Sequence, residues 1–247
     1  PMDYVASVVK ELGLDKKTIA VEMDNYYFTA RAFERLVAGL PDAKFVDGDL
    51  LVNWVRIIKS PNEIALQRRA GKIAELAMQA AIDNLHAGAR QCDVVAKIYE
   101  AQLRGTAEFG GDYASIVPLM PQGETAGAPH LTWTDKKYPD NTVVAVELAG
   151  CHMRYHSPMA RTVCIGKPSQ KVIDTAEIAV EGLNAALEQV KPGNTCEQVE
   201  GAWRKVLAKY GMEKESRIGY SMGLNFPPDW GEHTASLRPG DKRVLVP

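Results

Sequence analysis

The sequence has few cysteines, almost no net charge and no long hydrophobic run. Its 247 residues carry a formal net charge of -2, which gives no electrostatic reason to expect nucleic acid or an anionic membrane as a partner. No apolar stretch approaches the about 20 residues that a membrane helix needs. The cysteines form no Cys-x-x-Cys pair, so neither zinc nor a disulfide framework is indicated, and reduced thiols in a cytoplasmic protein are expected. They are Cys92, Cys151, Cys164 and Cys196.

What is present is typical of a folded globular protein. Hydrophobic residues make up 46% of the chain and charged residues 24%. The length is sufficient for a large core and allows one or two domains. The chain begins at Pro1 and stops at Pro247, in what reads as the middle of a structural unit. We therefore expect a fragment that lacks part of its active site.

Residues 1–58 alternate between helical and strand patterns. We expect helices over residues 4–12 and 29–40 and strands over residues 18–22 and 43–46. A new helix begins after Ser60, because a hydroxyl cap, a proline and an acidic residue follow one another as Ser60, Pro61 and Glu63. It runs to about Leu85 and stops near Gly88. Its expected core-facing residues are Ile64, Ile73, Ala77, Ala80 and Ala81.

The remainder predicts a strand hairpin between pairs of helices. Helices are expected over residues 92–103, 168–190 and 196–210, with the turn 191–195 capping the last one. Residues 143–166 read as a hydrophobic strand, a sharp polar turn over residues 151–158 and a returning strand. Residues 225–234 contain two prolines and a glycine, so we expect a rigid, irregular loop there.

Glu147 stands out because it lies on an otherwise apolar strand, where an unpaired charge is costly. Such a carboxylate is either paired with a base, for which Arg154 and Arg161 are near, or is positioned in a pocket. His152 and His156 flank a turn rather than share a helix face, so we do not expect them to bind a metal ion. Arg154 is instead suited to a bidentate grip on a substrate carboxylate.

Two further positions remain open from the residues alone. His130, in the run Ala-Pro-His-Leu, is either an acid-base residue or a histidine that makes one structural hydrogen bond. Trp230 either packs inward at a turn or forms part of a binding site.

The hairpin resembles the metal-bearing hairpin of the creatinase, prolidase and methionine-aminopeptidase superfamily, which has the pita-bread fold. The junction Arg56, Ile58, Lys59, Ser60, Glu63 and Ile64 is similar to the linker of creatinase-like proteins. The resemblance implies an α+β fold, with part of a small α/β N-terminal domain over residues 1–58. A pita-bread catalytic domain, truncated at its C-terminal end, would follow over residues 59–247.

The resemblance also assigns metal-ligand positions, and this chain departs from three of them. Glu147 and Pro158 stand where two Asp ligands are expected, and Tyr220 stands where a His is expected in a Gly-His-x-x-Gly-Leu run. Proline has no donor atom and a phenol is a poor ligand for such ions. The resemblance therefore implies a site without metal or other cofactor. His130 stands where the superfamily keeps a catalytic histidine, the acid-base residue of creatinase.

The strings GYSMGLNFPPDWGEH and ELAGCHMRYHSP resemble one subfamily, the ectoine hydrolases. That resemblance implies hydrolytic opening of the cyclic amidine ring of ectoine to N-acetyl-2,4-diaminobutyrate, in a cytoplasmic homodimer followed by a deacetylase. Glu147 would attack or activate water, and His130 would move the proton. The expected substrate-binding residues are Arg154, Tyr220, Phe226, Trp230, Glu232 and His233. A metal-dependent Xaa-Pro dipeptidase or aminopeptidase, a creatinase-like amidinohydrolase and an inactive binding module are the alternatives.

Overall fold

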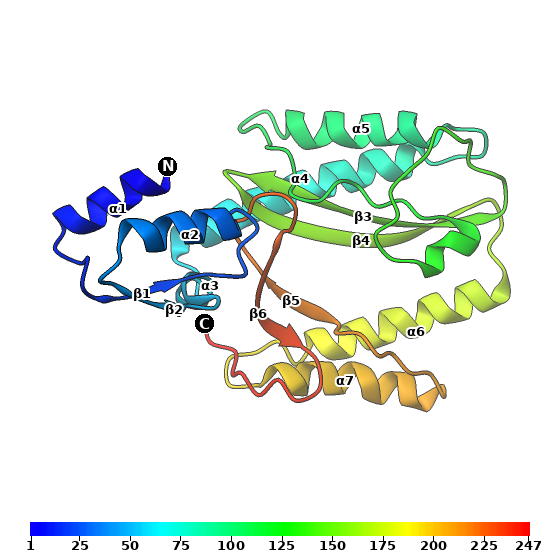
Figure 1. Ribbon diagram of the computed structural model, residues 1–247. Helices are drawn as coiled ribbons and strands as arrows, with labels where there is room; N and C mark the ends of the chain where they lie inside the picture. Colours follow the sequence, from blue (N-terminus) through cyan, green and yellow to red (C-terminus); the bar gives the residue numbers. More distant parts are fainter. The chain divides into compact units, whose positions relative to one another are not determined.

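The computed structural model describes residues 1–247 and divides into two compact units, Pro1–Ile57 and Ile58–Pro247 (Figure 1). The smaller unit alternates helices with two strands that pair in parallel, Thr18 opposite Lys44. Ala6, Leu36 and Leu40 form its buried centre. Its elements are α1 (Met2–Glu11), β1 (Thr18–Val21), α2 (Ala30–Gly39), β2 (Lys44–Asp47) and α3 (Leu51–Val55).

The helices and strands expected in this unit are present, with ends that differ by one or two residues. The Thr29 hydroxyl accepts a hydrogen bond from the Ala32 N–H and so caps α2. The short helix α3 was not predicted, since its five residues include valines and leave Val52 and Val55 exposed, which is a weak helical pattern.

The larger unit contains two helix pairs and two strand hairpins. In the whole molecule, no helix is both long enough and apolar enough to cross a membrane. Figure 1 shows α4 and α5 beside the first hairpin and α6 and α7 beside each other. The elements are α4 (Pro61–Asn84), α5 (Gln91–Arg104), the 3-10 helix η1 (Gly123–Gly127), β3 (Thr142–His152), β4 (Tyr155–Ile165), α6 (Gln170–Leu187), α7 (Cys196–Lys209), β5 (Gly219–Met222) and β6 (Gly231–Leu237).

The caps that the sequence predicted are formed. The Ser60 side chain accepts from the Glu63 N–H, while Glu63 accepts from the Ser60 N–H, which is a complete capping box. Thr195 caps α7 in the same way with Gln198. The prediction for Ile64 was wrong: its side chain is 40% exposed, because it lies in the first turn of α4, ahead of the part that packs on the hairpin.

Ala80, also expected in the core, is only half-buried. The other three residues expected on the core-facing side of α4, namely Ile73, Ala77 and Ala81, are completely buried.

The first hairpin is longer and its turn tighter than predicted. β3 and β4 pair antiparallel from Thr142 opposite Ile165 to His152 opposite Tyr155, so the expected polar turn of residues 151–158 is mostly paired strand. Only Met153 and Arg154 form the turn, with φ of 48° and 66°. Two successive residues in the left-handed region match the twist of the strands and let pairing continue to the end.

One face of this hairpin packs against α4 and α5. Val144, Val146 and Leu148 are buried in a common core with both helices. Gly150 lies directly on α4, where a β-carbon would collide with the backbone of Ala70. The opposite face, which includes Glu147 and its cross-strand partner Ala160, is therefore turned away from the helices.

The second hairpin is short and irregular. Tyr220 pairs with Ser236 and Met222 with Gly231, with a register shift between them. The irregular loop expected over residues 225–234 ends earlier, because residues 231–234 already belong to β6. The His156 N–H donates to the Gly223 carbonyl, and this contact holds the end of β5 beside the turn of the first hairpin.

Candidate active site

Glu147 projects from β3 on the face that does not pack on the helices. Its cross-strand neighbours on that face are Ala160 and, one pair further on, Pro158 opposite Ala149. The Glu147 side chain is half-buried and takes part in no ion pair of the structure, so of the two alternatives the pairing with Arg154 or Arg161 is not found. A half-buried carboxylate without a cation on it is available to a cationic ligand.

Tyr220, which lies within electrostatic reach of this carboxylate, is held in place by Trp230. The indole N–H of Trp230 donates to the Tyr220 hydroxyl at 2.7 Å, and Trp230 itself is 1% exposed. Burial raises the pKa of the Tyr220 phenol, and the negative charge of Glu147 raises it further, against the Trp230 hydrogen bond. The phenol therefore stays protonated at neutral pH and keeps its own O–H as a donor.

Asp229 and His233 form a second polar pair near Tyr220. The Asp229 Oδ2 lies 2.8 Å from the His233 Nε2, and the Asp229 Oδ1 accepts from the Gly231 N–H. His233 has a φ of 57°, an uncommon conformation for a residue with a β-carbon. The negative charge of Asp229 also raises the pKa of Tyr220, which places this pair within electrostatic reach of the phenol.

Glu232 is held by a lysine that the sequence did not connect with it. Its carboxylate lies 3.0 Å from the Lys59 Nζ, and both side chains are almost entirely buried. The two residues meet over Gly223, where a β-carbon would collide with the Glu232 carboxylate. Lys59 had been noted only as part of the linker, because nothing local in the sequence indicates a contact 173 residues away.

Arg154 has a different environment from the one expected of a substrate-binding residue. Its guanidinium donates to the carbonyl oxygens of Asn225 and Tyr113 and to the Ser115 hydroxyl. The rings of Tyr113 and Phe226 lie 4.4 and 4.8 Å from it. These contacts occupy most of its donors and fasten the hairpin turn to two loops, while the carboxylate grip stays a prediction. Phe226, expected among the substrate-binding residues, stacks on Arg154.

His156 is a buried structural residue that the sequence showed only as part of a turn. Its Nε2 accepts from the Ser115 N–H at 3.0 Å, and its side chain is completely buried. Burial and the nearby charge of Arg154 lower the pKa of His156 to about 4, so the ring is neutral at pH 7. His152, at the end of β3, lies 2.9 Å from the Gly110 carbonyl. Neither histidine belongs to a metal-ligand cluster.

His130 lies on an exposed loop and has a φ of 64°. Its side chain makes no hydrogen bond within the chain, so a structural hydrogen-bonding role is not supported. The backbone places it one segment away from Glu147: Leu131 accepts from the Met120 N–H, and Leu119 exchanges two hydrogen bonds with Glu147. His130 thus precedes a residue that is one chain segment removed from Glu147, and its role as a proton carrier stays a prediction.

The residues of this chain do not fit the two-metal site of the superfamily. Pro158 shares a face with Glu147 but has no donor atom, and the Tyr220 hydroxyl already accepts from Trp230. No three His, Cys, Asp or Glu side chains gather anywhere in the chain. A hydroxyl that is engaged by an N–H donor and carries a raised pKa is a poor match for a divalent cation.

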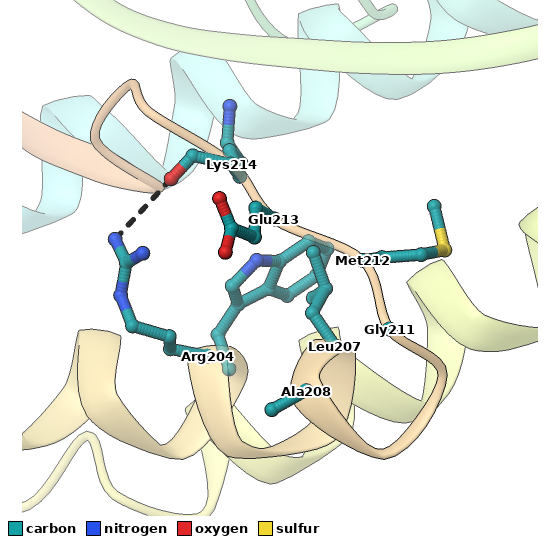
Figure 2. Close-up of a pocket in the computed structure, with 8 residues that line it drawn as sticks. Arg204, Leu207, Ala208, Gly211, Met212, Glu213 and Lys214 are labelled. Carbon is teal, nitrogen blue, oxygen red and sulfur yellow. Dashed lines mark hydrogen bonds between the residues drawn. The ribbon is translucent and has the colours of Figure 1, made fainter.

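A separate cavity of about 470 Å³ lies at the end of α7 (Figure 2). The Arg204 guanidinium crosses it to donate to the Lys214 carbonyl oxygen at 3.2 Å. The Trp203 indole N–H has no acceptor there. None of the predicted site residues lines this cavity. The lining residues are Trp203, Arg204, Leu207, Ala208, Gly211, Met212, Glu213 and Lys214.

Comparison with known proteins places the two units in known families. The sequence pattern of metallopeptidase family M24 matches residues 65–247, and that of the creatinase/prolidase N-terminal domain matches residues 2–58. The chain is 47% identical over 244 residues to an uncharacterised hydrolase/peptidase of Sinorhizobium fredii, covering 99% of this chain and 62% of that protein. It is 41% identical over 254 residues to the ectoine hydrolase of Halomonas elongata, covering 100% of this chain and 64% of that protein.

Solved structures show the same fold at low identity. The prolidase from Thermococcus sibiricus superposes with a TM-score of 0.84 at 22% identity, covering 100% of this chain and 65% of that one. The prolidase from Pyrococcus furiosus gives 0.80 at 24% identity, covering 100% and 68%. The pita-bread fold expected from the hairpin and linker is thereby confirmed. The chain spans roughly three fifths of the length of its first curated relatives, 62%, 64% and 58%.

Proposed function

The chain belongs to metallopeptidase family M24, and from that premise we propose that the whole protein is a metal-independent hydrolase that opens the cyclic amidine ring of ectoine to N-acetyl-2,4-diaminobutyrate. One observation carries the proposal. Glu147 faces away from the helices without a cation partner and within electrostatic reach of a protonated Tyr220, at positions where the superfamily places metal ligands. The 41% identity to an ectoine hydrolase supports the choice of substrate.

The chemistry follows from the charge of the substrate. Ectoine is a zwitterion whose amidinium carbon is already electrophilic, so a carboxylate suffices to bind the cation. Glu147 pairs with the amidinium and then attacks its carbon or activates a water molecule that does so. Water adds to that carbon, one ring C–N bond breaks, and the released nitrogen takes a proton. The acetyl group remains on the other nitrogen.

The neighbours of Glu147 have separate tasks in this scheme. His130, free of structural hydrogen bonds, delivers the proton to the departing nitrogen. Tyr220, oriented by Trp230, donates its O–H to the tetrahedral centre or to the attacking carboxylate. The aromatic faces of Tyr220 and Trp230 suit a delocalised cation. Lys59 and Glu232 brace β6 behind them.

A substrate panel tests the proposal. We expect the purified full-length protein to convert ectoine, followed by NMR, and to leave creatine and a Xaa-Pro dipeptide unchanged. Turnover of the dipeptide would instead identify a Xaa-Pro dipeptidase, like the Pyrococcus horikoshii protein of that name to which the chain is 27% identical. Turnover of creatine would identify an amidinohydrolase. Tight binding of ectoine without any turnover would identify a binding protein.

The assembly, location and pathway are further parts of the proposal. We expect a homodimer in the cytoplasm, whose acetylated product is consumed by a deacetylase. Sedimentation of the full-length protein tests the first point: a monomer at micromolar concentration would contradict it. Hydroxyectoine is a natural second compound for the substrate panel, because its added hydroxyl leaves the amidinium and the carboxylate in place.

A further inference from the structure

We propose that Arg217 is the residue that binds the substrate carboxylate. This inference rests on the proposed function, because it begins from the two charges of the ectoine zwitterion. Glu147 offers the site an anion for the amidinium, and a carboxylate a few ångströms away on the same small ring needs a cation. This cation must lie near Glu147 and have N–H donors that no acceptor of the protein occupies.

Four of the candidate cations are occupied or point elsewhere. Arg154 is enclosed by its own carbonyl acceptors and two aromatic rings. Arg161 pairs across the hairpin with Val146, so its side chain leaves from the helix-packed face, opposite to Glu147. Lys59 is engaged with the buried Glu232 carboxylate. The His233 Nε2 is engaged with Asp229.

Arg217, by contrast, has most of its N–H donors unoccupied. Its guanidinium lies 4.2 Å from the centre of the Tyr220 ring. The single hydrogen bond it makes is a long one, from Nη1 to the Ser236 hydroxyl at 3.4 Å, and no carboxylate pairs with it. The side chain is exposed, so a ligand can reach it. A guanidinium stacked on a ring keeps its N–H donors at its edge, in the fork that fits a carboxylate.

Tyr220 connects this cation to Glu147. The negative charge of Glu147 raises the pKa of the Tyr220 phenol, and the positive charge of Arg217 lowers it. Both charges therefore act on the same ring, and they have opposite signs. A zwitterion lying over Tyr220 would have its amidinium toward Glu147 and its carboxylate toward Arg217. Arg217 is then a specificity-determining residue, and the reacting carbon is left to Glu147.

The test compares two substrates in two variants of the full-length protein. The substrates are ectoine and its carboxamide, in which the carboxylate is replaced by a neutral amide of similar size. Arg217→Met keeps the length of the side chain and removes the charge, and Arg217→Lys keeps the charge and removes the fork. For ectoine, we expect Arg217→Met to raise KM by about tenfold to a hundredfold, with kcat changed much less. Arg217→Lys should fall between this variant and the wild type.

The carboxamide separates binding from mere support of Tyr220. If Arg217 binds the carboxylate, the KM for the carboxamide is the same in wild type and Arg217→Met. If Arg217 only supports the Tyr220 ring, Arg217→Met raises KM equally for both substrates, and the proposal is wrong. Arg161→Met is the matched control, because it removes an exposed arginine from the other face of the hairpin, and its KM for ectoine should equal that of wild type.

The remaining outcomes are distinguishable from one another. An unchanged KM for ectoine in Arg217→Met overturns the assignment of Arg217 and leaves the proposed function standing. A wild-type protein that does not turn over ectoine overturns the proposed function and this inference with it. Should Arg217→Met fail to fold, as judged by its thermal midpoint, Arg217→Lys decides the matter through the same ratio of KM values for the two substrates.

Discussion

The two hairpins of the larger unit differ in regularity and in what they carry. β3 and β4 pair without interruption over their full lengths, and one of their faces is sealed by α4 and α5. β5 and β6 share few paired residues and contain a register shift, and their strands and connecting loop hold Tyr220, Trp230 and the Asp229–His233 pair. The first hairpin is a scaffold that carries Glu147 on the face away from the helices, while the second presents polar and aromatic groups, among them Tyr220, whose pKa the charge of Glu147 raises.

Substitutions in the two hairpins should therefore have different effects, on stability in one case and on catalysis in the other. A change in the packed face of β3–β4 should cost stability and leave the chemistry of the folded fraction intact. A change at Glu147 or in the β5–β6 region should leave the fold intact and alter catalysis.

The largest effect is expected at Glu147. Glu147→Gln should lower kcat for ectoine by roughly 10²-fold or more, the scale of acid-base catalysis, without a change in thermal midpoint. His130→Ala should cause a loss of the same order. The double variant should be little worse than the worse single variant, because residues that act in one chemical step are not additive. Fully additive losses in kcat would show that the two residues act in separate steps.

The second effect belongs to the scaffold. Gly150→Ala places a methyl group against the backbone of Ala70 and Ala74, which cannot yield without moving α4. We expect a loss of about 3 kcal/mol in the free energy of unfolding, at the upper end of the usual cost of overpacking. Chemical denaturation measures it. Gly127→Ala is a control for alanine substitution without a neighbour, since nothing lies near its β-carbon position and its φ is not positive. Equal stability of Gly150→Ala and wild type would refute the packing.

The third effect is a pH dependence of stability that arises from His156. Its pKa is lowered from 6.5 to about 4 in the folded protein, so the unfolded chain binds the proton more readily. Stability should therefore fall as the pH decreases from about 6.5 to about 4, and this His156 contribution should level off below that. His156→Gln should flatten that part of the curve of unfolding free energy against pH. A slope in the variant identical to that of wild type would assign it to other groups.

A further effect is expected at Arg154, which joins the two regions. Arg154→Lys keeps the charge but cannot reach the Asn225, Tyr113 and Ser115 acceptors together. We expect a loss of about 1 to 3 kcal/mol in stability and an unchanged KM for ectoine. A raised KM with unchanged stability would return the carboxylate-binding role to Arg154 and remove it from Arg217.

Local signals in the sequence were enough for most of the scaffold. Ser60 and Thr195 each begin a helix, which each caps together with the side chain three residues later. The strand around Glu147 is apolar, so this one carboxylate stands out in the sequence. The resemblance to the superfamily places metal ligands at Pro158 and Tyr220, and these two residues therefore predicted a site without the usual metal ligands. Ile64 shows the limit of periodicity, since a repeat does not say where along a helix the packing begins.

The environment of the site could not be read in the same way. The Lys59–Glu232 pair joins residues 173 positions apart, and the acceptors of Arg154 come from two loops that approach it only in the fold. His156 looked like a surface residue of a turn, because its burial depends on a hairpin turn of two residues rather than eight. Arg217 carries no local signal at all, and only its stacking on Tyr220 singles it out.

We propose above all that this member of a metallopeptidase family hydrolyses ectoine without a metal ion. The most direct test is the rate of ectoine hydrolysis by the full-length protein after prolonged dialysis against a chelator, with the metal content of the same sample measured by mass spectrometry. The positions of Glu147, Pro158 and Tyr220 predict an unchanged rate in metal-depleted protein. Loss of activity on chelation, with recovery when Mn²⁺ or Co²⁺ is added, would contradict it.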